Sequence, residues 1–194
     1  MATIGVLALQ GDFAEHLAAL KKLGVQPREV RLPGELDGLD GLIIPGGEST
    51  SMARLMDIYG LREPLKERVR SGMTVWGTCA GMILLATKLT EDRPEPLGLM
   101  NIEVQRNGYG RQVDSFEADL PVPVLQTKTA FHAVFIRAPK VLSVGKNVTV
   151  LASLSQKGEV VAAQQDGMLA TSFHPELTED TRFHQYFLKM VGVH

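Results

Sequence analysis

Gly77-Thr78-Cys79-Ala80-Gly81 is the stretch of sequence that decides the fold. It follows the run Met73-Thr74-Val75-Trp76 and precedes the apolar run Met82-Ile83-Leu84-Leu85-Ala86. The sequence therefore predicts a strand, a tight turn and a helix, in that order. This G-x-C-x-G frame is the thiol form of a nucleophile elbow, in which small flanking residues let the chain bend sharply and present one reactive side chain.

Cys79 is the only cysteine of the chain. The predicted bend places it at a helix N-terminus, where free N–H groups and the helix dipole stabilise a thiolate, the form that attacks a carbonyl carbon. A single cysteine is also a common small residue of an apolar core. The choice between a nucleophile and a core residue depends on the rest of the chain.

The composition is that of a globular protein. The chain has 194 residues, 44% of them hydrophobic and 22% charged, which predicts one domain over residues 1–194. The net charge of -2 gives no reason to expect nucleic acid or an anionic membrane as a partner. One cysteine excludes a disulfide within the chain.

The N-terminal residues lack the basic segment and long apolar stretch of a signal peptide. No apolar run approaches the ~20 residues of a membrane span. We therefore expect a cytoplasmic protein.

Short strands alternate with helices in the first half of the chain. Apolar runs predict strands over 4–9, 25–32, 41–45 and 73–76, and periodic patterns predict helices over 13–23, 52–57, 61–70 and 82–86. Gly24 is placed to end the first helix, and Ser49, Thr50 and Ser51 are candidate N-caps. This order predicts an α/β fold of three layers, a mostly parallel sheet with helices on both faces and ligands beyond the carboxyl ends of the strands.

The second half is richer in short β segments. Strand-like pieces cover 134–136, 148–151 and 160–163, and a strand over 168–173 precedes a helix over 180–191. We expect antiparallel additions to the core sheet. Residues 90–98 are predicted to form a surface loop.

Ser172-Phe173-His174-Pro175-Glu176 follows the last predicted strand. Pro175 favours an extended His174, so that the imidazole and the Glu176 carboxylate can point to the same side. Because parallel strands end at one edge, this motif and Cys79 can meet there and form a Cys-His-Glu triad. An exposed turn with an incidental glutamate is the alternative.

Pro45-Gly46-Gly47-Glu48-Ser49 follows another predicted strand. Its glycines allow a peptide N–H to approach a ligand closely. We expect the N–H groups of Gly47 and Ala80 to form the oxyanion hole that a thiolate attack requires. The same glycines also suit a simple strand-to-helix turn.

Along the chain the three motifs follow one another as Pro45-Gly46-Gly47, Gly77-Thr78-Cys79-Ala80-Gly81 and His174-Pro175-Glu176. In this order they resemble the class I, or triad-type, glutamine amidotransferases. The resemblance narrows to the glutaminase subunits of pyridoxal 5′-phosphate synthases, on five blocks of sequence: 5–11, 45–50, 106–107 with 110–116, 135–139 and 172–178. Mild departures from that pattern occur at Gln105, at Tyr109 and in residues 11–16.

The resemblance implies a flavodoxin-like fold and hydrolysis of L-glutamine to glutamate and ammonia. The ammonia would pass to a separate synthase subunit, which builds pyridoxal 5′-phosphate, and neither a cofactor nor a metal is implied. The family's glutamine-contacting positions fall on Gly47, Glu48, Ser49, Arg106, Ile136 and Arg137. Without the resemblance, Arg106 and Arg137 would be interpreted as solvated surface residues.

Because ammonia must not escape, we expect the site to face the partner and a flip of the Gly46-Gly47 region to complete the oxyanion hole on docking. The remaining histidines, His16, His132, His184 and His194, stand in no comparable motif, and without a Cys/His cluster we expect no metal site.

Three alternatives stay open from the sequence. The chain could be a glutaminase that serves another acceptor enzyme, although such a protein would lack the blocks around Arg106 and Arg137. It could be a cysteine hydrolase or peptidase that needs no partner. It could also be a binding subunit with a decayed site, against which the intact Cys79, His174 and Glu176 argue.

Overall fold

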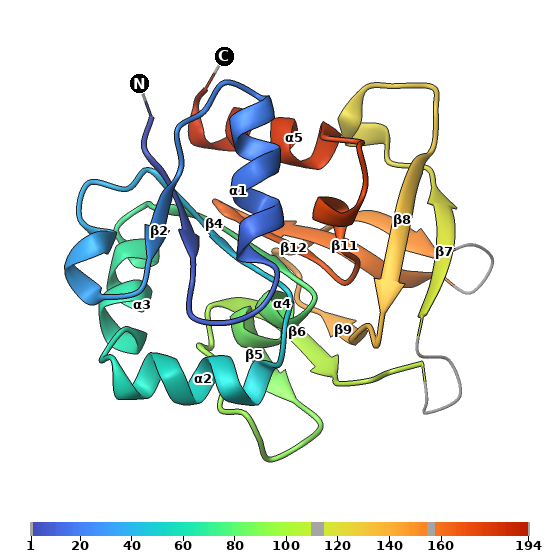
Figure 1. Cartoon of the computed structure of the whole chain (residues 1–194). Coiled ribbons are helices and arrows are strands. Elements are labelled where there is room, and N and C mark those ends of the chain that lie inside the picture. The colour runs from blue at the N-terminus through green and yellow to red at the C-terminus, as the bar shows by residue number, and fades with distance from the viewer. Residues whose placement is uncertain (1, 110–114, 155–157, 194) are drawn as a thin grey trace.

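A seven-stranded sheet runs through the middle of the computed structural model, which describes residues 2–109, 115–154 and 158–193 (Figure 1). Its strand order is β10-β11-β12-β4-β3-β1-β2. Five strands are parallel: β1 (Ile4–Leu7), β2 (Arg28–Val30), β3 (Gly41–Ile44), β4 (Thr74–Thr78) and β12 (Met168–Thr171). Two more extend it antiparallel: β10 (Thr149–Leu154) and β11 (Glu159–Gln165).

Helices cover both faces of this sheet (Figure 1). One face carries α1 (Phe13–Lys22) and α5 (Arg182–Val191), and the other carries α2 (Ser49–Ile58), α3 (Arg62–Arg70) and α4 (Ala80–Leu85). Three short 3₁₀ helices complete the helical elements of the described residues: η1 (Pro33–Leu36), η2 (Pro123–Leu125) and η4 (Pro175–Leu177).

The inner strands are buried on both faces, so their alternate side chains feed two separate cores. On β3, Leu42 and Ile44 pack toward α2, α3 and α4, whereas Ile43 packs toward α1 and α5. Trp76 of β4 joins the second core, beside Phe183 and Phe187. This explains why the sequences of these strands are continuous apolar runs rather than alternating ones.

Two smaller sheets lie outside the main one. A three-stranded sheet contains β5 (Ala86–Leu89), β6 (Met100–Gln105) and β9 (Lys140–Val144), and a hairpin pairs β7 (Ser115–Leu120) with β8 (Phe131–Ile136). Phe131 and Phe135 of β8 contact Phe173, which fixes the hairpin against the chain that leads to His174.

The predicted fold class is confirmed: three layers, a mostly parallel sheet and antiparallel additions. Gly24 follows α1 with φ of +78° and donates its N–H to the Lys21 carbonyl, as a helix-ending glycine does. The strand predicted over 25–32 is shorter, because β2 lies at the sheet edge and pairs only with β1. Among the described residues, no helix has both the length and the apolar character that a membrane span needs.

The predicted N-cap of α2 is wrong. Glu48, and not Ser49, Thr50 or Ser51, precedes the helix in an extended conformation, and its carboxylate accepts the N–H groups of Thr50 and Ser51 at 3.1 and 2.6 Å. A glutamate side chain is long enough to turn back onto the first turn, where a negative charge also complements the helix dipole. The cap therefore belongs to residues 45–48, the glycine loop that joins β3 to α2.

Candidate active site

The glycines of the elbow are required by backbone contacts. A β-carbon on Gly77 would lie 2.4 Å from the carbonyl carbon of Gly81, and one on Gly81 would lie 2.1 Å from the carbonyl oxygen of Ile44. Real β-carbons do not approach backbone so closely, so helix α4 can pack this tightly on β3 and β4 only with glycine at both positions. The sharp turn between them is thereby held in place.

Cys79 stands at the tip of this turn, at the N-cap of α4, with φ of +48°. Positive φ is uncommon for a residue with a side chain and marks a constrained position. Its N–H donates to the Thr171 carbonyl of β12 at 2.8 Å, and its Sγ lies 3.8 Å from the Ile136 carbonyl oxygen at the end of β8. The position of the thiol is therefore fixed by β4, which it directly follows, and by contacts with β12 and β8.

His174 and Glu176 follow the carboxyl end of β12, at the same end of the parallel strands as Cys79. The His174 Nδ1 lies 2.8 Å from Glu176 Oε1, and both side chains are buried. The backbone between them turns into η4 rather than staying extended, yet the side chains meet as the sequence predicts. The His174 N–H donates to the Val134 carbonyl of β8 at 2.8 Å, which anchors the histidine backbone.

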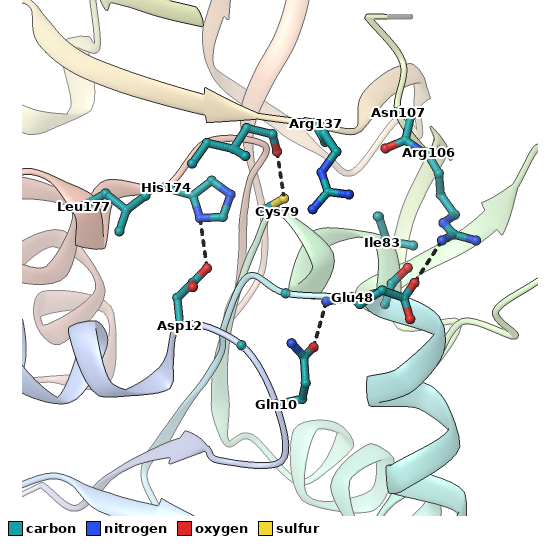
Figure 2. A pocket seen from close by; sticks show the side chains of 14 residues that line it. Gln10, Asp12, Glu48, Cys79, Ile83, Arg106, Asn107, Arg137, His174 and Leu177 are labelled. Carbon is teal, nitrogen blue, oxygen red and sulfur yellow. Dashed lines mark hydrogen bonds and ion pairs between the residues drawn. The ribbon is translucent and has the colours of Figure 1, made fainter. Parts of the chain in front are cut away.

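Asp12, at the N-cap of α1, adds a second carboxylate to His174. Its Oδ2 lies 3.4 Å from the same Nδ1. Figure 2 shows this contact, with the other ring nitrogen turned toward Cys79. Burial alone would lower the pKa of His174, but hydrogen bonds with Asp12, Cys79 and Glu176 outweigh it and raise that pKa to about 12. The free site therefore favours an imidazolium beside the sulfur.

Burial raises the pKa of Glu176, and the hydrogen bond from His174 opposes that rise. Asp12, His174 and Glu176 have atoms of the kind that bind metal ions within 4.8 Å of one another. The His174 Nδ1, however, is already hydrogen-bonded to Glu176. We interpret the group as a proton-holding cluster.

A pocket of about 380 Å³ opens over Cys79 and His174 (Figure 2). It brings together all six residues that the resemblance assigns to glutamine binding, Gly47, Glu48, Ser49, Arg106, Ile136 and Arg137. Glu176 and Ala80 do not line it: Glu176 is buried against His174, and Ala80 is buried in the first turn of α4. The lining also includes residues to which the sequence assigned no role in the site: Gln10, Gly11, Asp12, Ile83, Asn107 and Leu177.

The glycine loop is held from below by Gln10. Gly47 has φ of +150°, and a β-carbon there would lie 2.6 Å from Gln10 Oε1. The same oxygen accepts the Glu48 N–H at 2.7 Å. The conformation of Gly47 is therefore coupled to the Gln10 side chain.

The two arginines of the pocket are held differently. Arg106 donates to Glu48 Oε1 at 3.1 Å and to the Arg93 carbonyl at 3.0 Å, so its guanidinium is fixed at the rim. Arg137 directly follows β8 with φ of +41°, and Figure 2 shows its guanidinium turned into the pocket. Both arginines border the pocket, and neither is merely a remote surface charge.

Two of the remaining histidines, which stand in no comparable motif, are brought beside the site by the fold. His16 and His184 are fully buried, and His16 Nε2 lies 3.4 Å from Glu176 Oε2. No sequence motif marks this pair, because His16 comes from α1 and His184 from α5, and only the fold brings them behind the triad.

Comparison with known proteins identifies the family of this chain. Residues 6–193 match the SNO glutamine amidotransferase family. The chain belongs to that family. Of the five blocks that carry the resemblance, the part over residues 110–114 lies outside the described residues.

Two relatives of this family member align with it over almost their whole lengths. It is 56% identical over 189 residues to a protein of Herpetosiphon aurantiacus named pyridoxal 5′-phosphate synthase subunit PdxT, covering 96% of this chain and 98% of that protein. A protein of Thermosipho africanus with the same name is 54% identical, with 97% and 98% covered.

Solved structures give the same result. A crystal structure described as a glutamine amidotransferase superposes with a TM-score of 0.91 at 49% identity, covering 98% of this chain and 99% of that one. A chain from the structure of PurLQS from Thermotoga maritima, at 16% identity and a TM-score of 0.71 over 97% of both chains, shares the fold alone.

Proposed function

We propose that this chain is a single glutaminase domain that hydrolyses L-glutamine to L-glutamate and ammonia and delivers the ammonia to the synthase subunit of a pyridoxal 5′-phosphate synthase. The observation that carries the proposal is the His174–Glu176 pair, 2.8 Å apart, beside Cys79 at the floor of the pocket. Membership in the amidotransferase family and the names of the relatives support the substrate and the pathway.

The first step is acylation of Cys79. The thiolate attacks the side-chain amide carbon of glutamine, and the carbonyl oxygen becomes negative. The N–H groups of Gly47 and Ala80 stabilise this oxyanion. The His174 imidazolium then gives its proton to the departing nitrogen, so that ammonia leaves and a γ-glutamyl thioester remains on Cys79.

The second step is hydrolysis of that thioester. The now neutral His174 takes a proton from water, which attacks the thioester carbon and releases glutamate. The Cys79 thiolate and the His174 imidazolium are restored together. Glu176 holds the Nδ1–H throughout, which fixes the ring orientation and stabilises the imidazolium.

The glutamine head group binds at the rim of the pocket. Its α-carboxylate can form an ion pair with the guanidinium of Arg106 or Arg137. Its α-ammonium can bind the carboxylate of Glu48 and the backbone carbonyl of Ile136. Ser49 is 3% exposed and closes the pocket beside Glu48.

The synthase partner completes the site in this proposal. In this proposal the peptide at Gly46-Gly47 rotates on docking and aims the Gly47 N–H at the substrate, since glycine permits that rotation at little steric cost. Since Gln10 contacts both Gly47 and the Glu48 N–H, a partner that displaces Gln10 would release the loop. Docking would then couple ammonia release to an available acceptor.

Ammonia release from L-glutamine, measured with and without the synthase subunit, tests the proposal. We expect low release from the chain alone and a marked rise in the complex. Cys79→Ala should reduce release in the complex by at least about 1,000-fold while leaving the fold and the synthase binding intact. Equal activity with and without the synthase would reject the partner's role, and turnover by Cys79→Ala would reject the mechanism.

A further inference from the structure

Two fully buried histidines lie directly behind the proposed triad. His16 of α1 and His184 of α5 face each other, with His16 Nδ1 3.0 Å from His184 Nε2. Both rings pack edge-on against Trp76, with ring centroids 5.6 and 5.0 Å apart. The mechanism proposed above uses neither ring.

The free oxygen of Glu176 points to this pair. Oε1 of Glu176 is occupied by His174, whereas Oε2 is buried and lies 3.4 Å from His16 Nε2. Among the described residues, Oε2 accepts no hydrogen bond in the structure, and the 3.4 Å contact with His16 is a charge contact only. A buried carboxylate oxygen needs a donor, since its desolvation is otherwise uncompensated.

Both histidines are neutral in this environment. Burial lowers the pKa of His16 well below its ordinary value, and the neighbouring His184 and His174 lower it further. Burial also lowers the pKa of His184 to about 4. Each neutral ring carries one N–H, so the 3.0 Å contact between them holds a single proton.

Two tautomer patterns satisfy that contact. In the first, His184 Nε2–H donates to His16 Nδ1, and His16 Nε2–H donates to Thr78 Oγ1 at 3.2 Å with Glu176 Oε2 3.4 Å from the same nitrogen. In the second, His16 Nδ1–H donates to His184, and the bare His16 Nε2 directs its lone pair at the carboxylate.

The second pattern is the poorer one. In it the Thr78 hydroxyl can donate to His16 Nε2, but that nitrogen offers no proton to the buried carboxylate. It also places a proton on His184 Nδ1, which is buried with no partner among the described residues. An unmatched buried N–H is rarer in proteins than an unmatched acceptor. The first pattern leaves only an acceptor unmatched.

We propose that His184 and His16 form a neutral donor relay, His184 Nε2–H to His16 Nδ1 and His16 Nε2–H to Glu176 Oε2, that positions the triad carboxylate and keeps it ionised. The effect of the relay on catalysis rests on the proposed Cys-His-Glu triad. The tautomers of His16 and His184 are independent of that proposal. Because the relay carries no net charge, it donates a hydrogen bond to the carboxylate without repelling the His174 imidazolium.

Other charged and titratable groups also face Glu176. His174 follows β12, Asp12 stands at the start of α1, and Cys79 lies at the elbow. Asp12 opposes ionisation of Glu176 and His174 favours it. In the proposed relay His16 donates to the second carboxylate oxygen, so its removal should raise the pKa of Glu176.

Nitrogen-15 NMR of the histidine-labelled full chain tests the relay without any activity. His16→Gln and His184→Gln assign the two buried rings. We expect both to carry their proton on Nε2 and to show no titration between about pH 5 and 8. Both protons on Nδ1, or a doubly protonated His16, would overturn the relay, and neither result would bear on glutamine hydrolysis.

Kinetics in the complex with the synthase test the positioning role. His16→Leu should lower kcat/KM for glutamine by roughly 10- to 100-fold and move its acidic limb to higher pH, because Glu176 loses a donor to its charged form. His16→Gln keeps a side-chain N–H near the Nε2 position, so it should restore most activity and the original limb. His184→Phe should show the same upward shift in weaker form, since His16 Nδ1 loses its donor.

Leu20→Val is the matched control, because Leu20 is fully buried on the same helix and makes no polar contact with the site. It should lower stability without moving the pH profile. If His16→Leu also left the acidic limb in place, or if His16→Gln failed to rescue while the NMR variants stay folded, the positioning role would be rejected.

Discussion

A β-carbon on Gly46 would lie 2.4 Å from Cε1 of the His174 ring, so the glycine loop and the proposed general base are in direct contact. The same β-carbon would come within 2.9 Å of Asp12 Oδ2. Gly46 therefore does more than allow a turn after β3. The His174 imidazole occupies the space that a side chain at position 46 would fill.

Gly46→Ala should reduce ammonia release by roughly 100-fold or more, because the imidazole must move off its line to Cys79 and misplacement of a catalytic group by about 1 Å has effects of that size. The measurement is kcat/KM for glutamine in the synthase complex. Gly34→Ala is the control, since a β-carbon at Gly34 meets nothing within 4 Å. Near-normal activity of Gly46→Ala would contradict the assigned place of His174.

Asp12→Asn should lower the pKa of His174, because the Asp12 carboxylate favours the charged ring. The folded-state pKa of His174 lies above its unfolded value of about 6.5, so the protonated ring adds stability below that pH, and this stability is lost as the pH rises through the folded-state pKa. The variant should therefore lose most stability near pH 6. An NMR titration of the His174 Cε1 proton measures the shift.

Glu15→Gln is the matched control for Asp12→Asn, because Glu15 is an exposed carboxylate in the first turn of the same helix. It should leave the His174 titration unchanged. Equal midpoints for Asp12→Asn and the unaltered chain would mean that the 3.4 Å contact has no electrostatic effect.

Much of the site could be predicted because its parts are local in sequence. The elbow, the glycine loop and the His-Pro-Glu segment each follow a strand, and the parallel order of β3, β4 and β12 brings those ends to one edge. Residues such as Cys79 and His174 need only that topology to meet. The resemblance to known amidotransferases added the residues of the rim.

Asp12, His16 and His184 could not be found this way. Asp12 and His16 lie one turn apart at the start of α1, and His184 lies 168 positions beyond His16. Nothing local distinguishes a helical histidine that packs on Trp76 from any other buried one. Their role depends on how α1 and α5 cross the sheet, and this is a property of packing rather than of pattern.

Glu48 combines two tasks that substitutions can separate. Its carboxylate caps α2 through Thr50 and Ser51 and also pairs with Arg106. Glu48→Gln keeps an acceptor oxygen for the cap but removes the charge, so glutamine KM should rise with a stability loss of less than about 1 kcal/mol. Glu48→Ala should raise KM similarly and lower the free energy of unfolding by about 1 kcal/mol more, the usual value of an N-cap. Denaturant unfolding and steady-state kinetics give the two numbers, and equal stabilities would show that the cap contributes nothing.

Arg137 offers a test of strain at the substrate rim. A residue with a side chain at φ of +41° loses roughly 1 kcal/mol relative to glycine, which adopts positive φ freely. Arg137→Ala and Arg137→Gly both remove the guanidinium that points into the pocket, so both should raise the KM for glutamine by roughly 10-fold or more. Only Arg137→Gly should also relieve the backbone, and it should be the more stable of the two by about 1 kcal/mol in denaturant unfolding. If Arg137→Ala were as stable as Arg137→Gly, the positive φ would carry no strain, and unchanged KM in both would remove Arg137 from the glutamine site.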